Sequence, residues 1–176
     1  MRIIAVVSYL LLAGVVGCSS GLDGALDVGE TDCVVPESST EFINETLTLV
    51  NRERELRGLQ PVVLNEGLAA VAGNYACRMI EDGFFGHTNP LTGERFEDRH
   101  VMSEFRCCPA GENLARGHAS PAAVVEDWMD SVLHRKVILE EEYVEIGLGL
   151  RVDSSTGELY WVLWLVCDPI YGCVGP

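Results

Sequence analysis

Positive charge is scarce in this chain of 176 residues. Lys and Arg together number 12, against 27 Asp and Glu, which gives a formal net charge of −15. Strong acidity repels phosphate backbones and anionic headgroups, so nucleic acid and anionic lipid surfaces are poor partners. Removing the N-terminal signal described below makes the chain one unit more negative, because that segment contains Arg2 and no acid.

Several familiar catalytic and metal-binding patterns are also missing. No serine lies in a nucleophile-elbow pattern, and the sequence has neither a C-x-x-C pair nor a His-x-x-x-His spacing. A covalent serine nucleophile is therefore not indicated, and a structural zinc site is the weaker interpretation of the cysteines.

The N-terminal apolar run is too short for an ordinary membrane span. It extends from Ile3 to Val16, whereas a spanning helix needs about 20 residues, so it has the form of a secretory signal. The segment from Val15 to Cys18 resembles a bacterial lipobox, in which small residues precede a Cys that is acylated and becomes the mature N-terminus. The alternative is ordinary cleavage after Gly17. We expect lipidation of Cys18, because an unpaired N-terminal Cys would be an unusual thiol in a secreted protein.

Composition divides the chain into three segments. Residues 1–17 are the expected lipoprotein signal peptide. Residues 18–38 are rich in Ser, Gly and Asp and are expected to form a flexible tether, with Cys33 as its tie to the domain. Residues 39–176 are long enough for one domain with a sizeable core.

An even number of cysteines remains when Cys18 is set aside. In an exported chain this favours disulfides, and the adjacent Cys107 and Cys108 are expected to take different partners. The disulfide candidates are Cys33, Cys77, Cys107, Cys108, Cys167 and Cys173.

Capping signals and 3.6-residue periodicity predict the helices. The expected segments are 39–57, a helix capped by Asn65 that ends near Asp82, a helix that starts at Ser120-Pro121, and a short turn over 134–140. The first helix places Arg54 on its apolar face with Ile43, Leu47 and Val50, and the third places Val125, Trp128, Met129 and Val132 together. Residues 88–109 show no clear period and are interpreted as a long loop stapled by Cys107 and Cys108.

Two strands are predicted near the C-terminus. Residues 145–152 alternate strictly, residues 153–158 form a turn, and residues 159–166 are apolar throughout, which indicates a hairpin whose second strand is covered on both faces. Helices followed by such a hairpin predict an α+β domain, a three-layer α-β-α sandwich with a C-terminal antiparallel hairpin.

Two His and two Glu from four segments are candidates for one cleft: His87, Glu112, His134 and Glu145. Two neutral imidazoles with carboxylates suit a divalent metal, and zinc is the metal they would favour. The same groups also suit a general acid and base, or a hydrogen-bonded cluster that only fixes the loops. His100 and His118 are expected to be surface histidines outside the site.

Five motifs in consistent order resemble the bacterial branch of the CAP superfamily, which includes cysteine-rich secretory proteins, antigen 5 and plant pathogenesis-related proteins. The resemblance covers roughly residues 41–167. The motifs are Phe85-Gly86-His87-Thr88, Gly111-Glu112-Asn113-Leu114-Ala115, Trp128-Met129-Asp130-Ser131 with His134-Arg135, Tyr143-Val144-Glu145-Ile146-Gly147-Leu148-Gly149, and Tyr160-Trp161-Val162.

The resemblance implies an SCP-like α-β-α sandwich with a shallow cleft lined by two His and one or two acids. His87, Glu112 and His134 carry over by motif position. Two positions depart from the family pattern: Ser131 stands where many eukaryotic members have a glutamate, and Leu133 stands where the family usually has Gly before the second His. Glu145 is our substitute for the missing acid.

The expected function is that of an extracytoplasmic binding module for a lipid, sterol, glycan or protein ligand. The alternative is a metal-assisted hydrolase acting on envelope peptide or glycan, and a non-enzymatic role is favoured. We expect no required cofactor, with zinc as the candidate metal. The protein is expected to be exported and held to the envelope membrane by its lipid, at the outer membrane in a Gram-negative host, or otherwise secreted.

Overall fold

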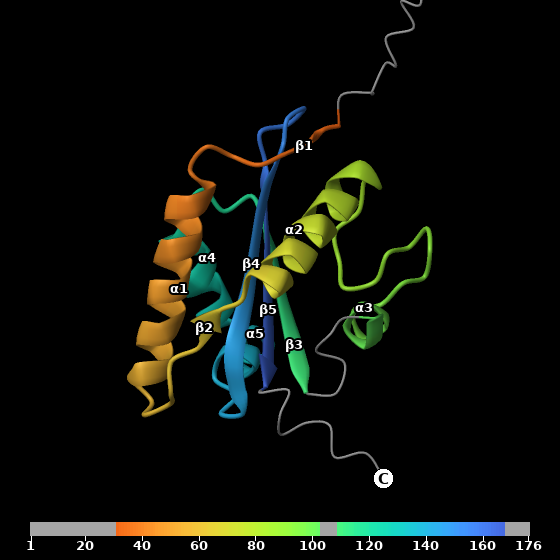
Figure 1. Cartoon of the computed structure of the whole chain (residues 1–176). Coiled ribbons are helices and arrows are strands. Elements are labelled where there is room, and N and C mark those ends of the chain that lie inside the picture. Colours follow the sequence, from red (N-terminus) through yellow and green to blue (C-terminus); the bar gives the residue numbers. More distant parts are fainter. Residues whose placement is uncertain (1–30, 103–108, 168–176) are drawn as a thin grey trace, which may run out of the picture.

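A five-stranded sheet forms the centre of the protein (Figure 1). The structure is a computed structural model that describes residues 31–102 and 109–167. The strands are β1 (Cys33–Val34), β2 (Val63–Leu64), β3 (Ala110–Arg116), β4 (Tyr143–Asp153) and β5 (Leu159–Cys167). Their order is β1-β4-β5-β3; these neighbours pair antiparallel, and β2 pairs parallel with β4. Strand β3 therefore lies at one edge of the described sheet.

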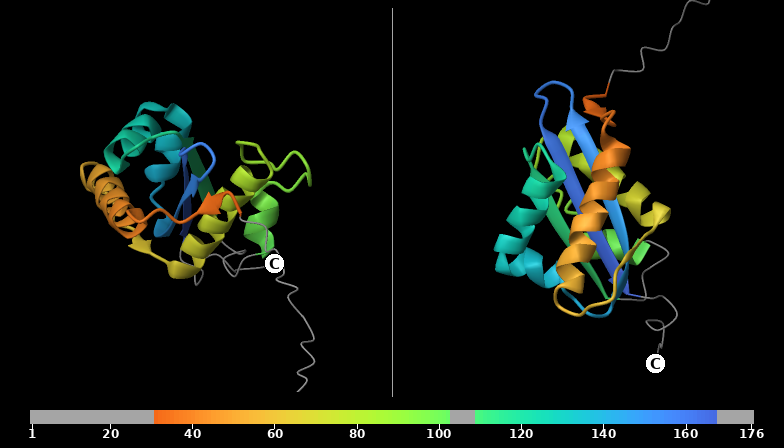
Figure 2. Two further views of the ribbon diagram at one scale, coloured as in Figure 1. Left: turned by 90° about the horizontal axis from the view of Figure 1, so that it is seen from above. Right: turned by 90° about the vertical axis from the view of Figure 1, so that its left-hand side faces the viewer.

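Helices cover both faces of this sheet, which makes three layers (Figure 2). The helices are α1 (Ser39–Glu55), α2 (Glu66–Glu81), α3 (Phe96–Met102), α4 (Pro121–Asp130) and α5 (Val132–Ile138). Helices α1, α4 and α5 lie on one side, and α2 and α3 lie on the other. The α+β sandwich expected from the sequence is the fold observed. Within the described residues, no helix has the length and apolar character needed to cross a membrane.

Two of the predicted helix starts are confirmed by their caps. The side chain of Asn65 accepts a hydrogen bond from Leu68 N, and that of Ser120 accepts one from Ala123 N. The end of α4 differs from the prediction. Ser131 adopts an extended conformation and caps a new helix, so Val132 starts α5 and is 70% exposed instead of continuing the apolar face of α4.

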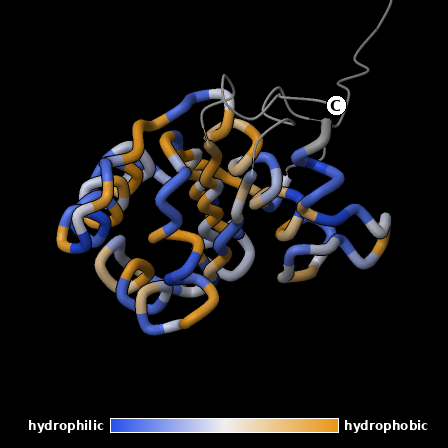
Figure 3. Tube along the Cα trace, turned by 90° about the horizontal axis from the view of Figure 1, so that it is seen from below, coloured by the Kyte–Doolittle hydropathy of each residue, from blue (hydrophilic) through white to orange (hydrophobic). Residues whose placement is uncertain are grey.

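The sandwich core has two faces because the strands alternate. Strand β5 is buried almost throughout: Trp161, Leu163 and Leu165 join the cluster under α1 and α4, while Val162 and Trp164 face the α2 layer. In the hydropathy view the apolar residues run through these central strands (Figure 3). The prediction of a second strand covered on both faces is confirmed.

Helix α2 packs very closely on β4 because glycines face it. A Cβ built on Gly149 would collide with the backbone of Ala72, and one built on Gly147 would lie 2.5 Å from the Cβ of Leu68. Small residues on α2, such as Ala72 and Gly73, and the facing glycines on β4 together allow this approach.

Arg54 fastens α1 to the segment between α5 and β4. It is completely buried on the apolar face where the sequence placed it, and burial lowers its pKa. Its guanidinium donates to the carbonyl oxygens of Gln60 at 2.9 Å, Ile138 at 2.8 Å, Glu140 at 2.8 Å and Tyr143 at 2.9 Å. Three of these carbonyls lie at the end of α5 or just after it, so Arg54 sets where α5 ends.

A disulfide joins Cys33 on β1 to Cys77 on α2, with the two Cα atoms 5.2 Å apart. The part of the expected tether around Cys33 is therefore fixed to the sheet. Cys167 ends β5 in a buried position. The candidates Cys107, Cys108 and Cys173 lie outside the described residues, as does the lipidation candidate Cys18.

Strand β1, within the expected tether, was not anticipated, and neither were two other elements. Residues 110–116, for which no element was predicted, form the edge strand β3, and the supposed loop over 88–109 contains helix α3. The small and polar residues of β3 hid its alternation, and α3 has only 7 residues, too few for a clear apolar period. Both elements carry residues of the site described next.

Candidate functional site

His87 is held by the carboxylate of Glu112. Its Nδ1 lies 2.8 Å from Glu112 Oε1; the imidazole side chain is 51% exposed, while that of Glu112 is 1% exposed. A carboxylate can only accept hydrogen bonds, so Nδ1 carries the proton and Nε2 is the ring atom left for a ligand. The pair thus presents an oriented, accessible imidazole on a buried support.

Arg99, from α3, neutralises the same carboxylate. Its Nη2 donates to Glu112 Oε1 at 3.0 Å and to Oε2 at 2.9 Å, and both side chains are almost fully buried. Both terminal nitrogens also approach the His87 carbonyl oxygen at 3.4 Å. Burial of a carboxylate is costly without a partner, and this guanidinium supplies one.

Tyr75 closes the network from α2. Its hydroxyl donates to the Gly86 carbonyl oxygen at 2.6 Å, and the Arg99 guanidinium carbon lies 3.3 Å from its ring centroid. Burial raises the pKa of Tyr75 to about 12, so the hydroxyl keeps its proton and remains a donor. Tyr75 therefore fixes both the residue before His87 and the cation behind Glu112.

His134 approaches β3 from the opposite layer. Consecutive residues on a strand point to opposite faces, so Glu112 reaches His87 while Asn113 reaches α5. The Asn113 Nδ2 donates to the His134 carbonyl oxygen at 2.9 Å, and Ser131 Oγ accepts from His134 N at 3.5 Å. Neighbouring residues of edge strand β3 thus hold both histidines: Glu112 binds the ring of His87, and Asn113 binds the backbone of His134.

The His134 ring lies in a less solvated environment than that of His87. Its Nδ1 is buried and has no hydrogen-bond partner among the residues that the structure describes. Burial lowers the pKa of His134, and the nearby His87 lowers it further, while Asp127 acts in the opposite sense. The two rings are therefore close enough to interact electrostatically.

The structure does not bring Glu145 to this cluster. Its Oε1 accepts a hydrogen bond from Asn65 Nδ2 at 3.2 Å, at the start of α2. Glu145 pairs with Val166 on β5, which pairs in turn with Ala110 on β3. Two strand spacings, roughly 10 Å, therefore separate Glu145 from β3.

The donor set does not match the expected metal site. In residues 31–102 and 109–167, no group of three or more His, Cys, Asp or Glu is arranged to hold a metal ion. Glu112 already binds Arg99 with both oxygens, and Glu145 lies elsewhere. The described residues thus do not fit the zinc ion considered from the sequence.

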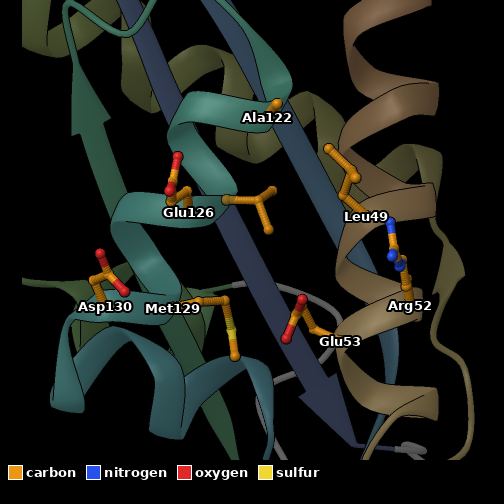
Figure 4. A pocket seen from close by; sticks show the side chains of 8 residues that line it. Leu49, Arg52, Glu53, Ala122, Glu126, Met129 and Asp130 are labelled. Atoms are coloured by element: carbon orange, nitrogen blue, oxygen red, sulfur yellow. The ribbon is translucent and has the colours of Figure 1, made fainter.

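A hollow of about 460 Å³ lies beside the His87–Glu112 pair. Its walls also include Thr88 and Gly111, together with three residues at the start of α3: Arg95, Phe96 and Glu97. The lining is mixed: Phe96 contributes a large apolar surface, and charged side chains such as Arg95 and Glu97 contribute polar atoms. A second groove, away from this site, lies between α1 and α4 (Figure 4).

The two histidines set aside from the sequence lie outside the cluster. His118 is 3.6 Å from Asp127 through Nε2, and its carbonyl oxygen accepts a hydrogen bond from Trp161. His100 stacks on Phe96 at 6.1 Å between ring centroids and lies 6.0 Å from Trp164, so it is more enclosed than a surface histidine.

Three residues that hold the site together were not predicted from the sequence: Tyr75, Arg99 and Asn113. Tyr75 lies in a segment that was predicted only as a helix, and Asn113 was quoted within a family motif without a role of its own. Arg99 lay in the supposed loop, although Glu97 and Asp98 before it are the acidic first turn typical of a helix. That signal was available in the sequence.

Similarity to known proteins extends over most of the chain. The family described as the cysteine-rich secretory protein family matches residues 47–168. In Bacillus subtilis (strain 168), the uncharacterized protein YkwD is 34% identical over 127 residues, which is 71% of this chain and 48% of YkwD. The uncharacterized membrane protein YlbC of the same organism is 33% identical over 109 residues, 60% of this chain and 30% of YlbC. The chain thus spans less than half the length of these curated relatives.

Solved structures share the fold. An outer surface protein from Borrelia burgdorferi superposes with a TM-score of 0.65 at 20% identity, covering 74% of this chain and 95% of that one. An extracellular protein containing an SCP domain from Bacillus anthracis gives a TM-score of 0.63 at 22% identity, covering 77% of this chain and 45% of that one.

Proposed function

Since the chain belongs to the cysteine-rich secretory protein (CAP) family, we propose that it is an extracytoplasmic binding module held at the cell envelope by a lipid on Cys18. Similar folds occur in a protein described as extracellular and in one described as an outer surface protein. A location outside the cytoplasm also agrees with the disulfide between Cys33 and Cys77, because disulfides persist in oxidising compartments.

The observation that carries the proposal is the half-exposed imidazole of His87, oriented by the buried Glu112 beside a hollow of mixed lining. A fixed imidazole with a free Nε2 binds hydroxyl, amide or carboxylate groups well. Sites for sterols and acyl chains are instead predominantly apolar. We therefore favour a glycan or a peptide segment of the envelope as the ligand at His87.

A lipid or sterol ligand would find a better place between α1 and α4. That groove has a volume of about 230 Å³, and Leu49, Val125 and Met129 supply its apolar lining. Figure 4 shows Leu49 on α1 and Met129 on α4 as two sides of the same space, with Glu53, Glu126 and Asp130 around it. The two ligand classes thus predict two different sets of sensitive residues.

Binding to the purified mature protein tests the choice between these classes. Envelope oligosaccharides, envelope peptides and vesicles of zwitterionic lipid are the probes, measured by isothermal titration. His87→Ala should weaken glycan or peptide binding by about 10-fold or more, the loss typical of an oriented polar contact, and the control His118→Ala should not. Binding of lipid alone, lost in Met129→Glu and kept in His87→Ala, would move the functional site to the α1–α4 groove.

The anchor is tested separately. Cys18→Ser should release the protein from the membrane fraction, because one acylated residue is the only membrane attachment that the proposal provides. Intact-mass analysis of the wild-type mature chain should show the added acyl groups. A mature chain that begins elsewhere, or that carries no acyl group, would contradict lipidation.

A hydrolase is the second candidate, because a carboxylate-oriented imidazole is also the arrangement of a general base. The proposal of binding alone predicts no turnover of the oligosaccharides or peptides that bind. Turnover that disappears in both His87→Ala and Glu112→Gln would establish the enzyme. Turnover that also needs added zinc would support the metal-assisted form.

A further inference from the structure

The carboxylate of Glu112 has little free capacity for another cation. An ionised carboxylate offers about four lone pairs on its two oxygens. Arg99 Nη2 binds both oxygens, and His87 Nδ1 binds Oε1 as well. Three of these four lone pairs therefore already accept hydrogen bonds from within the protein.

A divalent ion at Glu112 would also meet a positive charge at short range. The Arg99 guanidinium is 2.9 Å from Oε2 and is held within an almost fully buried pair. Two cations that share a carboxylate in a poorly solvated place repel each other strongly, because the screening there is weak. The other acid considered from the sequence, Glu145, binds Asn65 and cannot compensate.

The terminal guanidinium of Arg99 is held by Glu112, by the His87 carbonyl oxygen and by the Tyr75 ring. Its guanidinium lies 3.3 Å from the Tyr75 ring centroid, and Tyr75 in turn holds the Gly86 carbonyl next to His87. A planar guanidinium can stack on the ring of Tyr75 while its Nη2 binds both oxygens of Glu112 and its terminal nitrogens approach the His87 carbonyl oxygen, whereas a lysine ammonium cannot make all of these contacts at once. Arg99 is therefore a built part of the site and not a surface side chain that has folded inward.

We propose that Arg99 is the resident cation of this site, that it closes Glu112 to divalent metal ions, and that its removal turns the His87–Glu112 pair into a zinc-binding pair. This inference does not depend on the ligand proposed above. The guanidinium of Arg99 neutralises the charge of Glu112, as a metal ion would otherwise do. Binding of a ligand at His87 then needs no metal ion.

Zinc titration of the mature protein near pH 7.5 tests this inference. Arg99→Met keeps a long apolar side chain over Tyr75 but removes the charge, and it should bind Zn²⁺ at least about 10-fold more tightly than the wild type. Arg95→Met is the matched control: Arg95 lines the same hollow but pairs with Asp98, so its variant should match the wild type. The gain should disappear in Arg99→Met/Glu112→Gln and be absent in Arg99→Lys.

The wild-type protein gives a second test that does not require the Arg99→Met protein to fold. Saturating zinc should not release Arg99 from Glu112 in the wild type, so the NMR signals of the Arg99 guanidinium should keep the shifts that they have without zinc, because Glu112 is not a ligand while Arg99 binds it. Displacement of these signals by zinc, or no gain in a folded Arg99→Met, would overturn the assignment.

Discussion

The two sides of edge strand β3 hold their imidazoles in different ways. On the α2 side, His87 belongs to a closed network in which Glu112, Arg99 and Tyr75 bind one another. On the α5 side, the backbone of His134 is held by Asn113, but its Nδ1 is buried without a partner among the described residues. The first side thus fixes a half-exposed ring, whereas on the second side burial lowers the pKa of the ring.

The same contrast appears in how the two sides are fastened. The α2 side has a covalent link, Cys33–Cys77, in addition to its ion network. The α5 side depends on one buried arginine, Arg54, which binds backbone carbonyls at the end of α5 and beyond. Perturbing each fastening should therefore affect one imidazole more than the other.

The largest effect is expected from Arg54→Met. Loss of the guanidinium leaves the buried carbonyl groups of Ile138 and Tyr143 without this donor and removes two partly buried hydrogen bonds, so the free energy of unfolding should fall by about 3–5 kcal/mol. Amide protection should decrease most in α5, and the His134 resonances should broaden before those of His87. Arg57→Ala, which removes an exposed ion pair with Glu53, is the control and should change little. If the resonances of both histidines broaden equally, Arg54 does not support the α5 side more than the α2 side.

A smaller effect is expected from Cys33→Ser/Cys77→Ser. The disulfide closes a loop with a sequence separation of 44 residues, and restricting the unfolded chain to this extent contributes about 2–4 kcal/mol. Chemical denaturation measures the loss, and hydrogen exchange locates it. Protection should fall in β1 and α2 while α5 keeps its protection. An unchanged midpoint of unfolding would show that the link adds nothing to the α2 side.

Local signals in the sequence predicted much of the α2 side. Asn65 as a cap, the apolar stripe of α2 and the alternation of β4 each follow from neighbouring residues, and the structure confirms them. Family motifs named His87 and Glu112, and the structure brings these two together. Arg99, the cation that binds Glu112, was missed because it belongs to a helix of 7 residues, and a short polar helix has almost no apolar period to detect.

Long-range pairing limited the rest of the prediction. Glu145, which lies within a family motif, was chosen as the substitute for the acid missing at Ser131, but the register of β4 places it opposite Val166, and its side chain binds Asn65. The exposure of Val132 depends on a single extended residue, Ser131, which separates α4 from α5. Neither the register of a strand nor a one-residue break between helices is encoded in a periodic pattern.

The smallest predicted effect concerns the charge of His134, and it sharpens the contrast between the two rings. The ordinary pKa of histidine is about 6.5, and in the folded chain burial and the neighbouring His87 lower the pKa of His134. Between the lowered value and about 6.5, the unfolded chain therefore binds more protons at this position. The contribution of His134 to stability must then fall as the pH drops below about 6.5, and it becomes constant again below the folded pKa.

Two substitutions check this prediction. Relative to His134→Gln, the wild type should lose stability when denaturant titrations are moved from pH 7.5 to pH 5.5, because other titrating groups are common to both proteins. His87→Ala should raise the pKa of His134 in an NMR titration, since it removes the second cause of the shift, but burial should keep that pKa below its ordinary value. If His87→Ala leaves the His134 titration unchanged, the two rings are not coupled, and β3 separates two independent environments. If the pKa of His134 returns fully to the ordinary value, the charge of His87, and not burial, is the main cause of the difference between the two sides.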